Sequence, residues 1–301
     1  MCKMIAYSNE WFYGAHYIEE SGGHYAFGIY GLLQYIAPYS GRISTSLDEI
    51  REYFSMSEDS RTYMKHLKNG IKYLYDKEMI EFYSNPHMKE KIDFDVTMTK
   101  GKTPLYIRII NIPKIRYTLI KHTEFERIID DEVLNANTKL ELLCYFSSII
   151  CYTDVKRNIS YPSLNALNTA SKVGRLSTCS KYNDMLQDME IIVYDNAGVK
   201  VRKKEPSETG EDNGYVSNTY GRPEYKHEVD KYIQQLRDTH RAKELKKTDK
   251  NRANELRRYA TSLRHARNRL ANYTNEEDIK KEKANIRRLE ALYKALSDSK
   301  E

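Results

Sequence analysis

The chain has 301 residues, of which 40% are hydrophobic and 31% charged, and its 49 Lys+Arg and 43 Asp+Glu give a formal net charge of +6. That length allows two or three domains with a hydrophobic core. No run approaches the ~18 to 20 apolar residues of a membrane helix, and the first residues lack the apolar centre of a signal peptide. The four cysteines form no CxxC pair, so a zinc site is not indicated. We expect a cytoplasmic protein without a metal or another cofactor.

The positive charge is concentrated near the C-terminus. Residues 222–301 contain 22 basic and 14 acidic residues, a net charge of +8, which leaves −2 for residues 1–221. Within this tail, residues 241–269 hold eleven basic residues against three acids. A basic helix of this kind is either a solvated surface or a surface that contacts phosphates. The candidates for non-specific DNA or partner contact are Lys246, Lys247, Lys250, Arg257, Arg258, Arg264 and Arg267.

A helix-turn-helix pattern occurs first between residues 24 and 74. An apolar helix is expected over His24–Ala37, and Ser46 with Glu49 forms a capping box that starts a short helix over Leu47–Phe54. A longer helix follows, with Met64, Leu67, Ile71 and Leu74 on one face. Its opposite face supplies the candidate DNA contacts Arg61, Thr62, Lys65 and Lys68.

After this longer helix the hydrophobic period changes from 3.6 toward 2. Segments Ile92–Thr97 and Leu105–Ile110 flank a Gly-containing turn, which predicts a hairpin with Lys100 and Lys102 at a basic tip. Helix, short helix, turn, longer helix and hairpin in this order predict a winged helix, in which the third helix enters the major groove of DNA.

The same pattern appears a second time. A helix over Thr138–Tyr152, capped by Thr138, precedes a short helix near Pro162–Asn168 and a longer helix from Leu176. Ile191–Tyr194 and Val199–Val201 are expected to form a short second wing. The candidate DNA contacts of this copy are residue types that bond phosphates and base edges: Lys172, Arg175, Ser177, Thr178 and Lys181.

The segment Tyr161–Tyr194 resembles the helix-turn-helix of winged-helix proteins encoded on plasmids, phages and conjugative elements of Gram-positive bacteria. Many of these are replication initiators or replisome organisers, and Asn218–Arg222 is similar to a short element that follows such domains. The resemblance implies a mainly α fold with small β-hairpins (α+β), built from tandem winged helices. It also implies double-stranded DNA with repeated origin sequences as the ligand, and host replication proteins as further partners.

The C-terminal tail carries a heptad seam. Apolar residues from Leu256 to Tyr273 recur at spacings of 3 and 4, and a second amphipathic helix follows from Ile279 to Leu296. The pattern predicts an antiparallel helical hairpin turning near Asn272–Asn275, or a coiled coil that packs as a homodimer. The expected domains are therefore two winged helices (1–112 and 113–202), a polar linker (203–223) and a basic helical tail (224–301).

Motifs for catalysis are weak, so we expect no enzymatic activity. Gly101-Lys102-Thr103 ends like a phosphate-binding loop, but Val96 stands where the first glycine is required. Asp93 and Asp95 lie on one side of an expected strand, where a solvated face is the simpler interpretation than a metal site. Three functions remain open: a replication initiator or replisome organiser, a transcriptional or copy-number regulator, and an assembly protein whose helices bind other proteins.

Overall fold

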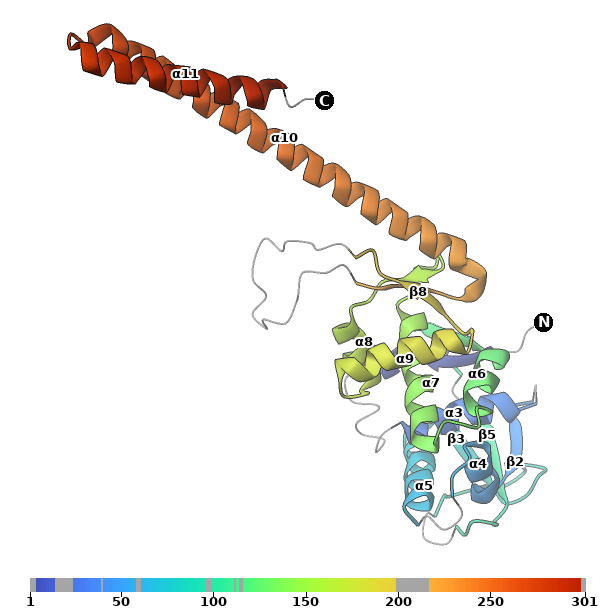
Figure 1. The fold of residues 1–301 in the computed structure, drawn as a ribbon. Helices are drawn as coiled ribbons and strands as arrows, with labels where there is room; N and C mark the ends of the chain where they lie inside the picture. The colour runs from blue at the N-terminus through green and yellow to red at the C-terminus, as the bar shows by residue number, and fades with distance from the viewer. Residues whose placement is uncertain are drawn as a thin grey trace. The chain divides into compact units, whose positions relative to one another are not determined.

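The computed structural model describes residues 4–13, 24–38, 40–57, 61–95, 99–110, 112–113, 116–198 and 217–298, except for the side chains of Lys243, Leu245 and Lys246. The chain divides into two compact units, Met1–Ile233 and Gln234–Glu301. The described residues are mainly helical and include small antiparallel sheets, which confirms the α+β class (Figure 1). The two N-terminal domains expected from the sequence thus belong to a single compact unit.

The first half of the N-terminal unit combines three helices with a four-stranded antiparallel sheet. The strands lie in the order β2-β5-β3-β4, so the last strand in sequence pairs with both β2 and β3. In chain order the elements are α3 (Tyr25–Ile36), β2 (Arg42–Thr45), α4 (Leu47–Tyr53), α5 (Arg61–Asp76), β3 (Ile80–Tyr83), β4 (Lys91–Ile92) and β5 (Leu105–Ile109).

The second half repeats this connectivity with a shorter sheet. Its strand order is β7-β9-β8, so the last strand again lies in the middle. In chain order the elements are α7 (Ala136–Cys151), β7 (Ile159–Ser160), α8 (Leu164–Ser171), α9 (Leu176–Asp188), β8 (Val193–Asp195) and β9 (Thr219–Gly221). Both halves therefore run helix, strand, helix, helix and then strands, with the same placement of the final strand.

Local capping explains where several helices begin. The Ser46 hydroxyl accepts a hydrogen bond of 3.2 Å from the Glu49 amide, which confirms the cap predicted for α4. At α7 the predicted cap is wrong, because the helix starts two residues before Thr138. Asn135 caps it instead, accepting from the Thr138 amide at 3.0 Å. Asparagine and threonine are both favoured N-cap residues, so the sequence alone did not distinguish Asn135 from Thr138 as the cap.

The first predicted hairpin is wrong in its strand pairing. β4 pairs with β3, whereas β5 pairs with β2 and β3, so Ile92 and Leu105 do not belong to facing strands of one hairpin. The turn near Gly101 is held against α4, because the Asp48 amide donates to the Gly101 carbonyl at 3.0 Å. Of the expected strand Ile92–Thr97, residues 96 and 97 lie outside the described residues.

The second predicted wing also pairs differently. Its return strand is β9, which pairs with β8 and β7, whereas residues 199–201 lie outside the described residues. β9 falls inside the region expected to be a linker, and the following 3-10 turn η1 (Pro223–Tyr225) starts at its last residue. The end of that region is therefore part of the folded N-terminal unit. A three-residue strand is too short to show an alternating pattern by itself.

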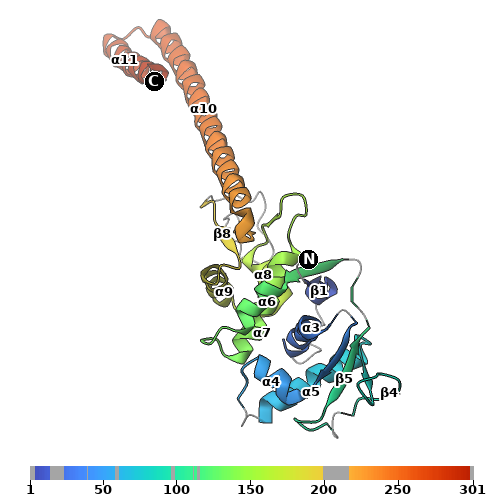
Figure 2. The same cartoon turned by 90° about the vertical axis from the view of Figure 1, so that its right-hand side faces the viewer.

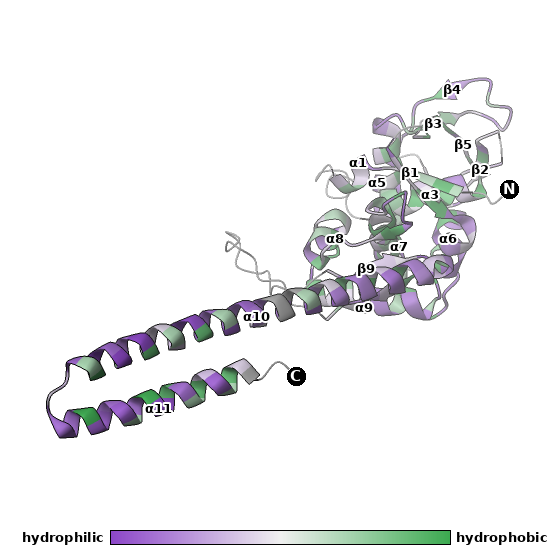
Figure 3. Cartoon of the chain, turned by 90° about the horizontal axis from the view of Figure 1, so that it is seen from above, coloured by the Kyte–Doolittle hydropathy of each residue, from purple (hydrophilic) through white to green (hydrophobic). Residues whose placement is uncertain are grey.

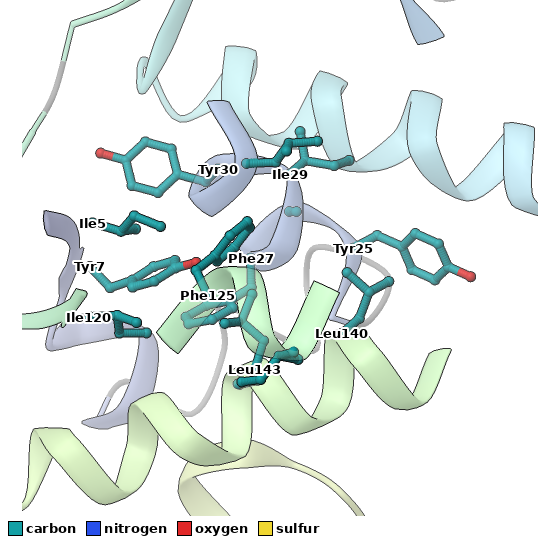
Figure 4. Close-up of a cluster of buried hydrophobic side chains, with 14 of the residues drawn as sticks. Ile5, Tyr7, Tyr25, Phe27, Ile29, Tyr30, Ile120, Phe125, Leu140 and Leu143 are labelled. Atoms are coloured by element: carbon teal, nitrogen blue, oxygen red, sulfur yellow. The ribbon is translucent and has the colours of Figure 1, made fainter. Parts of the chain in front are cut away.

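A short connector joins the two halves. β1 (Met4–Ser8) pairs antiparallel with β6 (Tyr117–Lys121), and α1 (Glu10–Tyr13) and α6 (His122–Ile129) follow these strands. Side chains from both halves pack in one hydrophobic core, where the rings of Tyr7 and Phe27 stack with centroids 3.9 Å apart (Figure 4). A Cβ on Gly28 of α3 would lie 2.1 Å from a methyl carbon of Leu140, so a larger residue there would force the Leu140 side chain of α7 to move.

The C-terminal unit is a helical hairpin. α10 (Lys226–Asn272) starts in the N-terminal unit and continues into this one, and α11 (Glu276–Asp298) runs back along it. Ion pairs Arg267–Glu290 (2.8 Å) and Arg269–Glu282 (2.9 Å) join the antiparallel helices. Figure 3 shows hydrophobic positions recurring along both helices. Among residues 234–298, Ala266 is the one described side chain that is fully buried. No helix in the described ranges has the length and apolar character needed to cross a membrane.

Candidate nucleic-acid interface

Helix α5 has an apolar face and a basic face. Leu67, Ile71 and Leu74 are buried, and Met64 is half-buried, so the predicted apolar side packs on the core. On the other side Arg61, Thr62 and Lys65 are exposed and Lys68 is half-buried. One turn further, Lys72 is ion-paired with Asp76 at 2.7 Å. The first three turns of α5 thus present cations to solvent.

Helix α9 presents a similar surface over its first two turns. Arg175 at the N-cap, Ser177 and Lys181 are exposed, Thr178 is half-buried, and Cys179, Tyr182 and Leu186 face the core. Arg175 and Lys181 make no ion pair with any residue that the structure describes. Lys172 lies at the C-terminus of α8 with φ of +56°, next to the turn that leads into α9.

The rest of α9 is acidic, which limits the basic surface. Asp184 and Asp188 are exposed on the last two turns, and Asp184 accepts a hydrogen bond from the Tyr194 hydroxyl on β8. Partial burial, together with this carboxylate, raises the pKa of Tyr194 to about 12. Since these carboxylates would repel phosphates, a polyanion is expected to meet α9 at its N-terminal end.

The wing residues are placed differently from the prediction. Lys100 and Lys102 are exposed, but they flank the Gly101 carbonyl that binds the α4 N-terminus, so they lie beside α4 and not at a hairpin tip. The hairpin tip that the structure shows is the loop Ser84–Glu90 between β3 and β4, which carries exposed His87 and Lys89. This loop was not predicted from the sequence, although Asn85-Pro86 is a turn signal.

Contacts between the halves fix how α5 and α9 are placed in the N-terminal unit. The Tyr25 hydroxyl donates to Asn137 at 2.7 Å, and His24 Nε2 lies 2.6 Å from the Ser171 carbonyl. Burial lowers the pKa of His24, so the ring is neutral and donates this bond. α4 and α5 lie toward one end of the unit, and α8 and α9 toward the other (Figures 1 and 2).

A buried lysine strengthens the same junction. Lys139 of α7 is 1% exposed, and its ammonium donates to the Ile129 carbonyl at 2.5 Å and to Ser55 Oγ at 3.0 Å. The Ile129 carbonyl is at the C-terminus of α6, where helix carbonyls favour a cation, and Ser55 follows the C-cap of α4. Burial lowers the pKa of Lys139, and Asp131 and Asp130 oppose that effect. The lysine thus joins both halves through the connector.

Cations of the C-terminal unit fall into two groups. Arg267 is ion-paired with Glu290, and Lys247 lies 3.8 Å from Glu244. By contrast, Lys250, Arg257, Arg258 and Arg264 are exposed and form no ion pair with any described residue. The side chain of Lys246 lies outside the described residues. The candidate contacts of the tail therefore differ in whether an acidic side chain already neutralises them.

The described side chains include no cluster of metal-binding type. No three His, Cys, Asp or Glu residues among them are grouped to hold a metal ion. Asp93, one of the two aspartates that sequence analysis noted, accepts a hydrogen bond of 2.9 Å from Tyr75.

Comparison of the sequence with known protein families and with curated proteins gives no match.

Proposed function

We propose that the protein binds double-stranded DNA sequence-specifically through α5 and α9, and that it acts as a replication initiator or replisome organiser. The observation that carries the proposal is the repeated arrangement of the N-terminal unit. Each half has a third helix with its apolar face in the core and cations on the opposite face. Each half also has the strand order in which the final strand lies in the middle.

This arrangement supports tandem winged helices. In a winged helix the second helix of the helix-turn-helix enters the major groove, and the strands that follow it contact the backbone. In chain order α5 and α9 correspond to that helix in their halves, and α4 and α8 precede them as a supporting helix would. We infer that Arg61, Lys65, Arg175 and Lys181 contact phosphates or guanine edges, and that polar Thr62, Ser177 and Thr178 contact bases.

Binding to duplex DNA tests this proposal. Affinity for a labelled duplex that contains DNA from upstream of the gene is measured against salt, and log K should fall linearly with log salt. Lys65→Ala and Lys181→Ala should each weaken binding and reduce the salt slope by about 1. Lys156→Ala removes the same charge from the exposed loop before β7 and serves as the matched control.

A replication role needs a separate test from DNA binding. A circle without an origin should persist in cells when it carries this gene with its upstream DNA, and Arg175→Ala should abolish that persistence. Sequence-specific binding without persistence would indicate a transcriptional or copy-number regulator. Absence of binding to any duplex at about 50 mM salt would indicate an assembly protein.

A further inference from the structure

A groove between the two helices of the C-terminal unit has the chemistry of a nucleic-acid site. It has a volume of about 550 Å³. α10 lines it with Leu263, Arg264, Arg267 and Asn268, and α11 lines it with Glu290 and Tyr293. Since α5 and α9 belong to the other unit, the duplex-binding proposal leaves this groove unexplained.

The charge of the groove favours an anion. Arg267 neutralises Glu290 at 2.8 Å, whereas Arg264 makes no ion pair with any described residue. Lys250 and Arg257 precede Arg264 at intervals of seven residues and are also unpaired, so the three cations recur every ~10.5 Å along one side of α10. A line of cations at this spacing fits a polymer of phosphates. The same line of cations disfavours a second copy of the C-terminal unit as the partner, because the two basic units would repel each other.

The aromatic side chain distinguishes single-stranded from double-stranded nucleic acid. Tyr293 lies in the helix seam but remains 38% exposed and lines the groove beside Arg264 and Arg267. Tyrosine and arginine stack on the faces of nucleic-acid bases, and every unpaired base offers such a face. The bases of a duplex are already stacked on one another. A tyrosine ring between cations therefore favours single-stranded over double-stranded nucleic acid.

We propose that this groove binds single-stranded nucleic acid, with a base stacked on Tyr293 and phosphates on Arg264 and the cations that precede it. The site extends the proposed function to a second kind of nucleic acid, and it does not depend on α5 or α9. Asn268, exposed on the groove wall, is placed to bond a base edge or a sugar.

The test measures binding of the full-length protein to a fluorescein-labelled oligothymidylate of about 20 nucleotides by anisotropy. Tyr293→Ala should weaken binding about tenfold, and Tyr293→Phe, which keeps the ring, should bind like the wild type. Tyr273→Ala is the matched control, since Tyr273 is 37% exposed but does not line the groove. Arg264→Gln should weaken binding more than Arg258→Gln, because Arg258 lies outside the groove.

Each of the following results would overturn the groove proposal: no binding of the oligothymidylate at low salt, equal effects of Tyr293→Ala and Tyr273→Ala, or loss of binding in Tyr293→Phe. Displacement of the oligonucleotide by polyglutamate, with no effect of Tyr293→Ala, would also overturn it and indicate an acidic protein partner. Circular dichroism shows whether each variant keeps its helices. Duplex binding is measured on the same variants and should be unchanged. Binding of oligothymidylate without binding of any duplex would refute the proposed function and would still support the groove proposal.

Discussion

The side-chain amide of Asn183 on α9 donates to the hydroxyl of Tyr220 on β9 at 3.2 Å, although the two residues are 37 positions apart. Tyr145 of α7 donates to the carbonyl oxygen of the same Asn183 side chain at 2.8 Å. All three side chains are buried, so the bonds satisfy polar groups that water cannot reach. β9 is thereby tied to the helix proposed to read DNA and to the first helix of its half.

Truncation tests this role of β9. A chain ending at residue 202 loses the middle strand of the β7-β9-β8 sheet and leaves the Asn183 side-chain NH2 without its Tyr220 acceptor, so its second half should unfold at a lower temperature than in the full chain. A chain ending at residue 233 keeps β9 and the start of α10, and should melt like the full-length N-terminal unit. Equal melting temperatures for the two truncated chains would show that β9 does not support the fold.

The stability of the N-terminal unit should fall in mild acid because of His24. Burial lowers its pKa below 6.5 in the folded state, so the unfolded chain takes up a proton first as the pH falls. The free energy of unfolding should therefore decrease below about pH 6.5 and level off once the folded state is also protonated. His24→Gln keeps a donor for the Ser171 carbonyl but cannot titrate. Urea unfolding of both proteins from pH 7.5 to 5 should show a steeper loss in the wild type, and identical slopes would contradict the assignment.

The stability of the N-terminal unit should rise in the alkaline range because of Lys139. Burial lowers its pKa below 10.5, so the folded state loses this proton before the unfolded state and stability should rise with pH in the alkaline range below 10.5. Lys139→Met should lack that rise. It should also cost about 1–3 kcal/mol at neutral pH, because the buried Ile129 carbonyl loses its donor. Lys156→Met, on an exposed loop, is the control. A stability profile unchanged by Lys139→Met would mean that the ammonium is solvated.

Helical periodicity made much of the fold predictable. α5 and α9 carry enough turns for buried and exposed positions to separate, so Leu67 was assigned to the core and Lys65 and Lys181 to the surface, as the structure has them. The Ser46 cap could also be predicted, because a capping bond joins residues only three positions apart in the sequence.

Strand pairing could not be predicted in the same way. β4 has two residues and β9 has three, and neither is long enough to show which strand it pairs with. The position of Lys100 and Lys102 depends on the bond from the Asp48 amide to the Gly101 carbonyl, which joins distant parts of the chain. Likewise, the sequence shows that Arg264 and Arg267 are basic, but the hairpin decides that Glu290 neutralises one of them.

The central claim is that α5 and α9 bind duplex DNA together, and quantitative footprinting on the DNA upstream of the gene tests it most directly. The account predicts protection of two neighbouring major-groove segments by the wild type. Lys65→Ala should weaken one segment, and Lys181→Ala should weaken the other. The Lys156→Ala control should give the wild-type pattern. Protection that is absent at about 50 mM salt, or that persists unchanged in both helix variants, would contradict the account.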